Sequence, residues 1–211
     1  MDAEVFLLDL SPERLRRLES QRQSRLVSLV SSRGLLERLV PSADLLIGAV
    51  LLPGDRAPTL VDEALVAQMQ PGSVIVDVAI DQGGCIATSR ETTHTDPVVT
   101  IHGVQHYAVG NMPGAVPFTS TEALVSVTLP YILVMAGRGL VEAVTDRPEL
   151  LSGLNTVHGA VCHPGVARAL RKNRDLHRVG QKTGGAFSGI DRADDEHAAL
   201  GFVGDRGHRF W

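Results

Sequence analysis

The stretch SVIVDVAIDQGG, residues 73–84, decides the fold, because an apolar run changes without transition into a carboxylate, an amide and two glycines. The residues from Val74 to Val78 are β-branched except for Asp77, and such a run is typical of a strand buried on both faces of a parallel sheet. Ligands of such sheets bind just beyond the carboxyl ends of the strands. Asp81 therefore lies where the ligand-binding and catalytic residues of such sheets are usually found. A strand followed by an ordinary polar turn fits the same residues.

The first 112 residues alternate between strand patterns and helical patterns. A strand is expected over residues 3–10, and the helix after it has Ser11 as its N-cap and Pro12 as its first helical residue. This alternation predicts an α/β fold with a parallel, doubly wound sheet. The other strands are expected over residues 25–30, 43–52, 73–78, 98–103 and 105–112, and the other helices over 34–39 and 60–73.

After residue 117 the pattern changes to helices. The stretch 120–139 predicts one long, mostly apolar helix that Pro130 kinks or splits, and a last helix is expected from about Pro164 to Arg171. The tail is rich in glycine and charge, without apolar periodicity, and is expected to be disordered. The predicted divisions are therefore 1–117, 118–171 and 172–211.

Composition excludes several classes of protein. A chain of 211 residues with 44% hydrophobic content can bury one large core or two small ones. Its net charge of -4 and pI near 6.0 give no electrostatic footprint for nucleic acid or an anionic membrane. Two cysteines make neither a disulfide framework nor a metal cluster. Without a signal peptide or about 18 consecutive apolar residues, a cytoplasmic protein is expected.

Long segments of the chain resemble the nicotinamide-nucleotide domain of the alanine dehydrogenase and nicotinamide nucleotide transhydrogenase family. The resemblance extends from about Ala3 to Leu170, and AIDQGG and HYAVGNMPGAVP favour the dehydrogenase branch over the transhydrogenase alpha subunit. It implies an incomplete Rossmann-type sheet followed by a helical segment of the substrate domain. The segments are ADLLIGAVLLPGDRAPTLV (43–61), MQPGSVIVDVAIDQGG (69–84), TTHTDPVVTIHGVQHYAVGNMPGAVPFTSTEAL (92–124) and TLPY (128–131).

The resemblance also implies a set of site residues. Asp81 corresponds to the catalytic aspartate beside the nicotinamide, and a carboxylate suits proton transfer within hydrogen-bond reach of the substrate. Asp9 corresponds to the ribose-binding acid, which favours NAD because it would repel a 2′-phosphate. For the aliphatic members the alternative is ordinary core packing. The other cofactor-binding residues are Arg14 and Ser31 on the adenosine side, Val50 and Leu51, Val78, Ala79 and Ile80, Arg90, and the capping loop of Val109, Gly110, Asn111 and Met112.

Several of the family's parts have no counterpart in this sequence. They are the catalytic histidine, the substrate-binding lysine and arginine, and the glycine-rich phosphate turn. The expectation is a chain truncated at its N-terminus that binds NAD weakly and does not turn over alanine alone. His94, His102 and His106 are expected to be structural. No metal is expected, because Val134 and Arg138 stand where some members carry a glutamate and a histidine.

Two kinds of function remain open. The first is an NAD-dependent alanine dehydrogenase, which reversibly deaminates L-alanine to pyruvate and ammonia. The second is a catalytically inactive remnant, or a fragment that needs a separate N-terminal part. Full-length relatives are homo-oligomers, commonly hexamers, and the long helix is expected to expose apolar surface accordingly. A monodisperse monomer without affinity for hydrophobic dyes would contradict that expectation.

Overall fold

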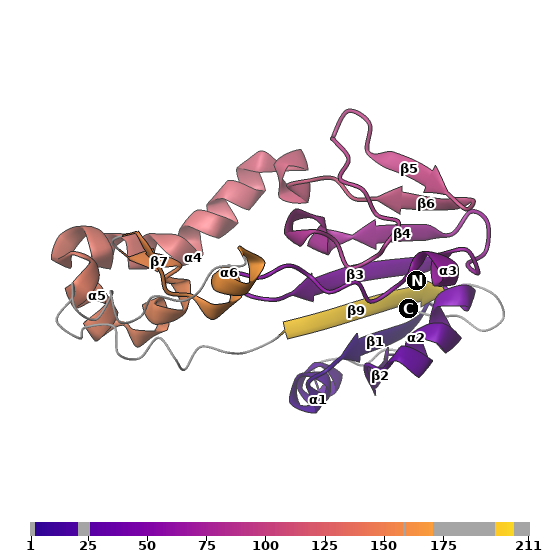
Figure 1. Cartoon of the computed structure of the whole chain (residues 1–211), viewed down its shortest axis with the longest axis horizontal. Coiled ribbons are helices and arrows are strands. Elements are labelled where there is room, and N and C mark those ends of the chain that lie inside the picture. The colour runs from indigo at the N-terminus through magenta and orange to yellow at the C-terminus, as the bar shows by residue number, and fades with distance from the viewer. Residues whose placement is uncertain (1–2, 21–25, 158, 171–196, 205–211) are drawn as a thin grey trace. The chain divides into compact units, whose positions relative to one another are not determined.

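The computed structural model describes residues 3–20, 26–157, 159–170 and 197–204. These residues form two compact units (Figure 1). The first unit contains the described residues as far as Leu52, those from Arg56 to Met112, and one strand near the C-terminus. The second contains Pro53–Asp55 and the described residues from Pro113 to Leu170.

A seven-stranded sheet forms the first unit, with strand order β2-β1-β9-β3-β4-β6-β5. β1 is parallel to β2, and β4 is parallel to both β3 and β6. Since β1 and β3 are each antiparallel to β9, these five strands run in one direction and their carboxyl ends share an edge. The strands are β1 (Glu4–Asp9), β2 (Leu26–Val30), β3 (Leu45–Leu51), β4 (Val74–Asp77), β5 (Val98–Ile101), β6 (Val104–Tyr107) and β9 (His197–Gly204).

The first helix of this unit begins at its predicted cap. At α1 (Pro12–Ser20) the Arg14 N–H donates to Ser11 Oγ at 3.4 Å, as the sequence predicts. α2 (Arg33–Leu39) is followed by the short 3-10 helix η1 (Val40–Ser42). α3 (Glu63–Val66) is much shorter than the helix predicted over 60–73. Turns take the place of the predicted helix between Val66 and Pro71.

The edge strand β5 departs from the predicted parallel arrangement. It forms an antiparallel hairpin with β6. His102 and Gly103 connect the two strands with φ of 53° and 76°, and positive φ at both central residues is the mark of a tight two-residue hairpin turn. Such a turn joins only antiparallel strands. β5 therefore lies at the edge in the opposite direction from β6.

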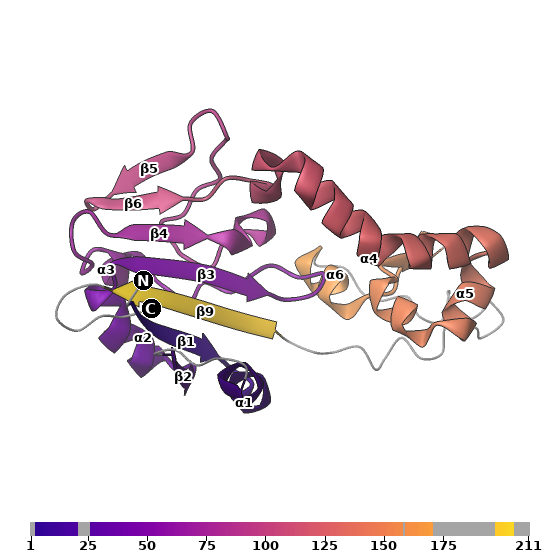
Figure 2. The same ribbon diagram turned by 180° about the vertical axis from the view of Figure 1, so that it is seen from behind.

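The strand β9 lies between β1 and β3, as Figures 1 and 2 show from opposite sides. It falls within residues 172–211, where the sequence predicts disorder; the rest of that segment lies outside the described residues. In doubly wound dinucleotide-binding sheets this central position belongs to the first strand, which runs parallel to its neighbours. β9 runs antiparallel to both, so it begins at the carboxyl edge, where Leu51 pairs with His197.

The core of the first unit is continuous from strand to strand. Leu8, Leu46, Ile75 and Val104 are fully buried on β1, β3, β4 and β6. Buried leucines and valines of α2 and α3 pack in the same cluster, together with Met69. This packing fixes the strand ends, from which the site residues project.

The second unit is mainly helical. Pro130 does not split the long helix, because α4 continues unbroken through it. A small core of Val144, Leu154, Val157 and Cys162 lies among the shorter elements. The elements are α4 (Pro117–Arg138), preceded by the 3-10 helix η3 (Met112–Ala115), α5 (Leu140–Asp146), the 3-10 helix η4 (Pro148–Gly153), β7 (Thr156–Val157), β8 (Ala160–Val161) and α6 (Pro164–Ala169).

α4 exposes much of its apolar surface. Phe118 is 77% exposed, and Leu124, Val127 and Leu133 are exposed as well. Within the described part of the chain, α4 is the one helix long and apolar enough to cross a membrane by length and composition. The helix itself was predicted from the sequence, but a run of about 18 consecutive apolar residues was not, because serines, threonines and Glu122 interrupt it.

Candidate functional site

All fourteen residues of the predicted site lie in the first unit, at or just beyond the carboxyl edge of its sheet or in the segments that follow. One group follows β1 and β2, and a second follows β4 and β6. Because these strands are parallel, their ends meet at one edge, as the sequence predicts. The roles of these residues in binding and catalysis stay predictions.

The first group is built around Asp9, whose side chain is only 4% exposed. Its Oδ1 accepts a hydrogen bond from the Ser11 N–H at 2.7 Å, and its Oδ2 lies 3.6 Å from Nη1 of Arg14. The Ser31 N–H donates to the Asp9 carbonyl at 2.9 Å. The fold thus brings Asp9, Arg14 and Ser31 together, although they come from three different segments.

The second group depends on Asp77, a residue that the sequence analysis assigned no role. Its side chain is fully buried at the end of β4. Oδ1 accepts from the Ala79 N–H at 3.1 Å, while Oδ2 accepts from the N–H groups of Cys85 at 3.1 Å and Ile86 at 3.3 Å. One carboxylate therefore folds the segment from Ala79 to Ile86 back over the strand end. The only sequence feature that sets Asp77 apart is that it is the one acidic residue in a β-branched run.

Two glycines give this carboxylate its space. A Cβ on Gly84, whose φ is +76°, would lie 2.9 Å from Asp77 Oδ2. A Cβ on Gly48 in β3 would overlap Cys85 Sγ. Burial raises the pKa of the Cys85 thiol, and the charge of Asp77 raises it further. Cys85 is therefore a neutral packing residue and no nucleophile.

The segment that Asp77 holds carries Asp81 on the 3-10 helix η2 (Val78–Gln82). Asp81 is exposed, and its Oδ1 accepts a hydrogen bond from the Asn111 N–H at 3.2 Å. Asn111 has a left-handed φ of 54°, and its carbonyl lies 3.1 Å from Nε2 of His94. The predicted acid and the predicted capping loop are thus in direct contact.

The remaining residues of the predicted site differ in how far they are exposed. Leu51 and Val78 are 46% and 48% exposed, so they offer apolar surface at the ends of β3 and β4. Arg90 and Asn111 are exposed, whereas Gly110 and Met112 are half-buried. Val50, Ala79, Ile80 and Val109 are buried and pack in the unit's interior, and their contact with a cofactor stays a prediction.

The histidines differ in their surroundings. His106 is buried between Thr88 Oγ1 at 2.7 Å and the Val104 carbonyl at 3.0 Å, and burial lowers its pKa. His102 Nε2 lies 2.9 Å from Glu63 Oε1 at the hairpin turn. Both have structural partners. His94 is different, because it contacts a residue of the predicted site.

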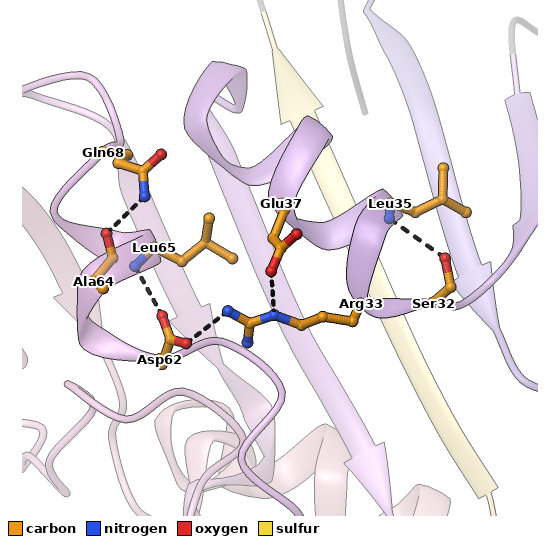
Figure 3. A network of polar contacts seen from close by, with 8 residues as sticks. All are labelled: Ser32, Arg33, Leu35, Glu37, Asp62, Ala64, Leu65 and Gln68. Carbon is orange, nitrogen blue, oxygen red and sulfur yellow. Dashed lines mark hydrogen bonds and ion pairs between the residues drawn. The ribbon is translucent and has the colours of Figure 1, made fainter.

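A polar network fixes the starts of α2 and α3 (Figure 3). Arg33 donates to Glu37 and to Asp62, each at 2.7 Å. Asp62 also caps α3 by accepting from the Leu65 N–H at 2.9 Å, and its pKa is lowered chiefly by the hydrogen bond from Arg33. Ser32 caps α2 in the same way through the Leu35 N–H. The network ties the helix that follows Ser31 to its neighbour.

These groups fit the two nucleoside ends of a nicotinamide dinucleotide. A buried carboxylate suits ribose hydroxyls, and exposed Leu51 and Val78 suit a flat ring. The central strand β9 begins at this edge, whereas a strand that leads into a pyrophosphate-binding turn and helix would end there. No group of three or more His, Cys, Asp or Glu side chains among the described residues could hold a metal ion. The absence of a metal stays a prediction.

Known proteins match most of this chain. A family model described as "Alanine dehydrogenase/PNT, C-terminal domain" matches residues 1–164. Alanine dehydrogenase of Lysinibacillus sphaericus is 51% identical over 170 residues, which are 80% of this chain and 46% of the relative. That of Bacillus subtilis (strain 168) is 52% identical over 171 residues, or 81% and 45%. The chain therefore spans about half the length of the curated relatives that it matches.

Solved structures agree with this assignment. One titled L-alanine dehydrogenase has a TM-score of 0.66 and 48% identity, covering 80% of this chain and 46% of that one. A transhydrogenase from Sinorhizobium meliloti has a TM-score of 0.50 and 25% identity, covering 74% and 41%. The higher identity lies on the dehydrogenase side, as the motifs predict. The α/β fold is likewise confirmed, and the chain belongs to the alanine dehydrogenase/PNT C-terminal domain family.

Proposed function

We propose that this chain supplies the nucleotide-binding and proton-transferring part of an NAD-dependent L-alanine dehydrogenase. The complete enzyme would deaminate L-alanine reversibly to pyruvate and ammonia. The observation that carries the proposal is the contact between Asp81 and the Asn111 N–H at the carboxyl edge of the sheet. Identity of about half to named alanine dehydrogenases, against 25% to a transhydrogenase, supports this reaction.

Different residues of the chain would have different roles in this reaction. Asp81 accepts and returns a proton as water and ammonia exchange at the substrate carbon, which a carboxylate within hydrogen-bond reach can do. The Asn111 N–H holds that carboxylate in one orientation. Leu51 and Val78 provide apolar surface that excludes water beside the reacting groups. The bound nicotinamide would supply the hydride acceptor.

The proposed cofactor is NAD, with Asp9 as the selecting residue. Repulsion between two charges near a protein surface amounts to about 1 kcal/mol or more, so NADP should bind at least about fivefold more weakly. Asp9→Asn keeps a side-chain oxygen for the Ser11 N–H but removes the charge, and should bring the two affinities within about twofold. Isothermal titration of the 211-residue chain with each nucleotide measures this.

Glu13→Gln is the matched control, because Glu13 is an exposed acid in the first turn of α1. It removes the same charge and should leave the preference for NAD unchanged. Equal binding of NAD and NADP by the unsubstituted chain would contradict the role given to Asp9. Arg14 makes the test informative, since its guanidinium lies beside Asp9 and could attract a 2′-phosphate.

The reaction itself is tested in a fusion, because the chain spans about half the length of its relatives. The N-terminal half of the Bacillus subtilis enzyme, joined to this chain, should form NADH when L-alanine and NAD are supplied. The unfused chain should not, because hydride transfer requires a substrate held within about 3.5 Å of the nicotinamide. A fusion that folds and binds NAD but forms no NADH from L-alanine would contradict the proposal.

A homo-oligomeric, cytoplasmic enzyme remains part of the proposal. The exposed apolar side chains of α4 support an interface, because a soluble monomer rarely leaves a large continuous apolar patch uncovered. The net charge of -4 favours neither nucleic acid nor an anionic membrane as partner.

A further inference from the structure

The segment from Glu91 to Pro97 is held firmly against the capping loop. The Thr92 N–H donates to the Ala108 carbonyl at 2.9 Å, and the Gly110 N–H donates back to the Thr92 carbonyl at 3.2 Å. Within the segment, Thr92 Oγ1 donates to the Pro97 carbonyl at 3.0 Å. A Cβ on Gly110 would overlap the Glu91 carboxylate, so the Glu91 side chain lies directly against Gly110. These contacts bring His94 to Asn111.

Asn111 has an unusual backbone conformation. Its φ of 54° lies in the left-handed region, which asparagine tolerates better than most residues other than glycine but which still costs it some free energy that local contacts can offset. Two contacts do so here. Its N–H donates to Asp81 Oδ1 at 3.2 Å, and its carbonyl lies 3.1 Å from His94 Nε2. Because a carbonyl oxygen only accepts hydrogen bonds, Nε2 is the donor in this contact.

We propose that His94 is a positioning residue for Asp81 and acts through the backbone of Asn111. By donating from Nε2 to the Asn111 carbonyl, His94 keeps that residue left-handed, and this conformation aims the Asn111 N–H at the carboxylate. The importance of this for catalysis rests on the proposed function, in which Asp81 transfers the proton. The hydrogen-bonded chain itself does not depend on that function.

Glutamine and asparagine distinguish the two nitrogens of the imidazole. The amide nitrogen of glutamine can reach the position of Nε2, whereas that of asparagine lies closer to the position of Nδ1. His94→Gln should therefore preserve the contact with Asn111, and His94→Asn and His94→Leu should remove it. His102→Asn is the control matched to His94→Asn, because His102 is also exposed, bonds Glu63 at the distant hairpin turn, and has a left-handed φ of 53° that asparagine tolerates.

The first measurement is amide hydrogen exchange by NMR on the unfused 211-residue chain. Exchange of the Asn111 amide should quicken about fivefold in His94→Leu and His94→Asn, the change expected when one hydrogen bond is lost. It should stay within about twofold of the parent in His94→Gln and His102→Asn. Unchanged exchange at Asn111 in His94→Leu would overturn the proposal, whatever the enzyme's activity.

The second measurement is kinetic and uses the fusion. His94→Leu should lower kcat about fivefold with the Kd for NAD unchanged, and His94→Gln should restore kcat. In an Asp81→Asn background, His94→Leu should have no further effect, since the two residues act as one unit. Equal losses in the Asp81 and Asp81→Asn backgrounds would overturn the proposal. A fusion without any activity would instead count against the proposed function and leave the exchange result standing.

Discussion

Asp81→Asn in the fusion enzyme is expected to lower kcat for L-alanine oxidation by about 10²–10⁴-fold, the usual contribution of a positioned acid or base. An amide cannot accept and return the proton that the exchange of water and ammonia at the substrate carbon requires. Steady-state formation of NADH measures the loss. The size of this effect follows directly from the role proposed for Asp81.

The substitution is suited to this test because it leaves the local fold intact. Asparagine keeps an oxygen that can accept from the Asn111 N–H, as Asp81 Oδ1 does at 3.2 Å. The Kd for NAD and the melting temperature should therefore change little. Asp96→Asn, at an exposed acid in the same unit, controls for loss of charge. A kcat within about tenfold of the parent would exclude Asp81 as the proton-transfer group.

Asp77→Ala is expected to lower the free energy of unfolding by about 3 kcal/mol or more. Three buried backbone N–H groups, those of Ala79, Cys85 and Ile86, donate to this carboxylate. Each donor that loses its partner costs about 1–3 kcal/mol, and the individual costs need not add. Urea denaturation of the 211-residue chain, followed by circular dichroism, measures the difference.

Asp77→Asn should destabilise the chain less than Asp77→Ala, because its one remaining oxygen can still accept from part of the turn. Asp96→Ala is the control for losing an acid, and its effect should stay within about 0.5 kcal/mol because the residue is exposed. If Asp77→Ala were as stable as Asp96→Ala, the turn that carries Asp81 would have to be held by contacts other than those of Asp77.

Local sequence patterns predicted the strands of the first unit other than β9, and the edge at which the candidate site lies. The run at 74–78 gave the strand, and its end placed Asp81 correctly, because apolar periodicity and burial in a parallel sheet are local properties. The partners of Asp77 lie up to nine residues away, and His94 lies 17 residues from Asn111. Such contacts form only in the folded chain, so the spacing of apolar residues in the sequence does not reveal them.

The direction of β5 and the existence of β9 were not predicted, for different physical reasons. His102 and Gly103 form a tight turn, but histidine is a weaker turn signal than asparagine or aspartate, so the hairpin was taken for two separate strands. β9 has glycine at 201 and 204 and lacks the alternation of a half-buried strand. Its strand pairing comes from the unpaired edges of β1 and β3, a tertiary property.

The most direct test of the account is the transfer of deuterium from L-alanine labelled at Cα to NAD by the fusion enzyme, measured by mass spectrometry of the reduced nucleotide. We expect labelled NADH from the fusion and almost none from its Asp81→Asn variant or from the unfused chain. Reduced nucleotide without deuterium would contradict it, because the hydride would then not come from the substrate carbon. Equal labelling by the Asp81→Asn variant would contradict the role of the residue at the centre of the site.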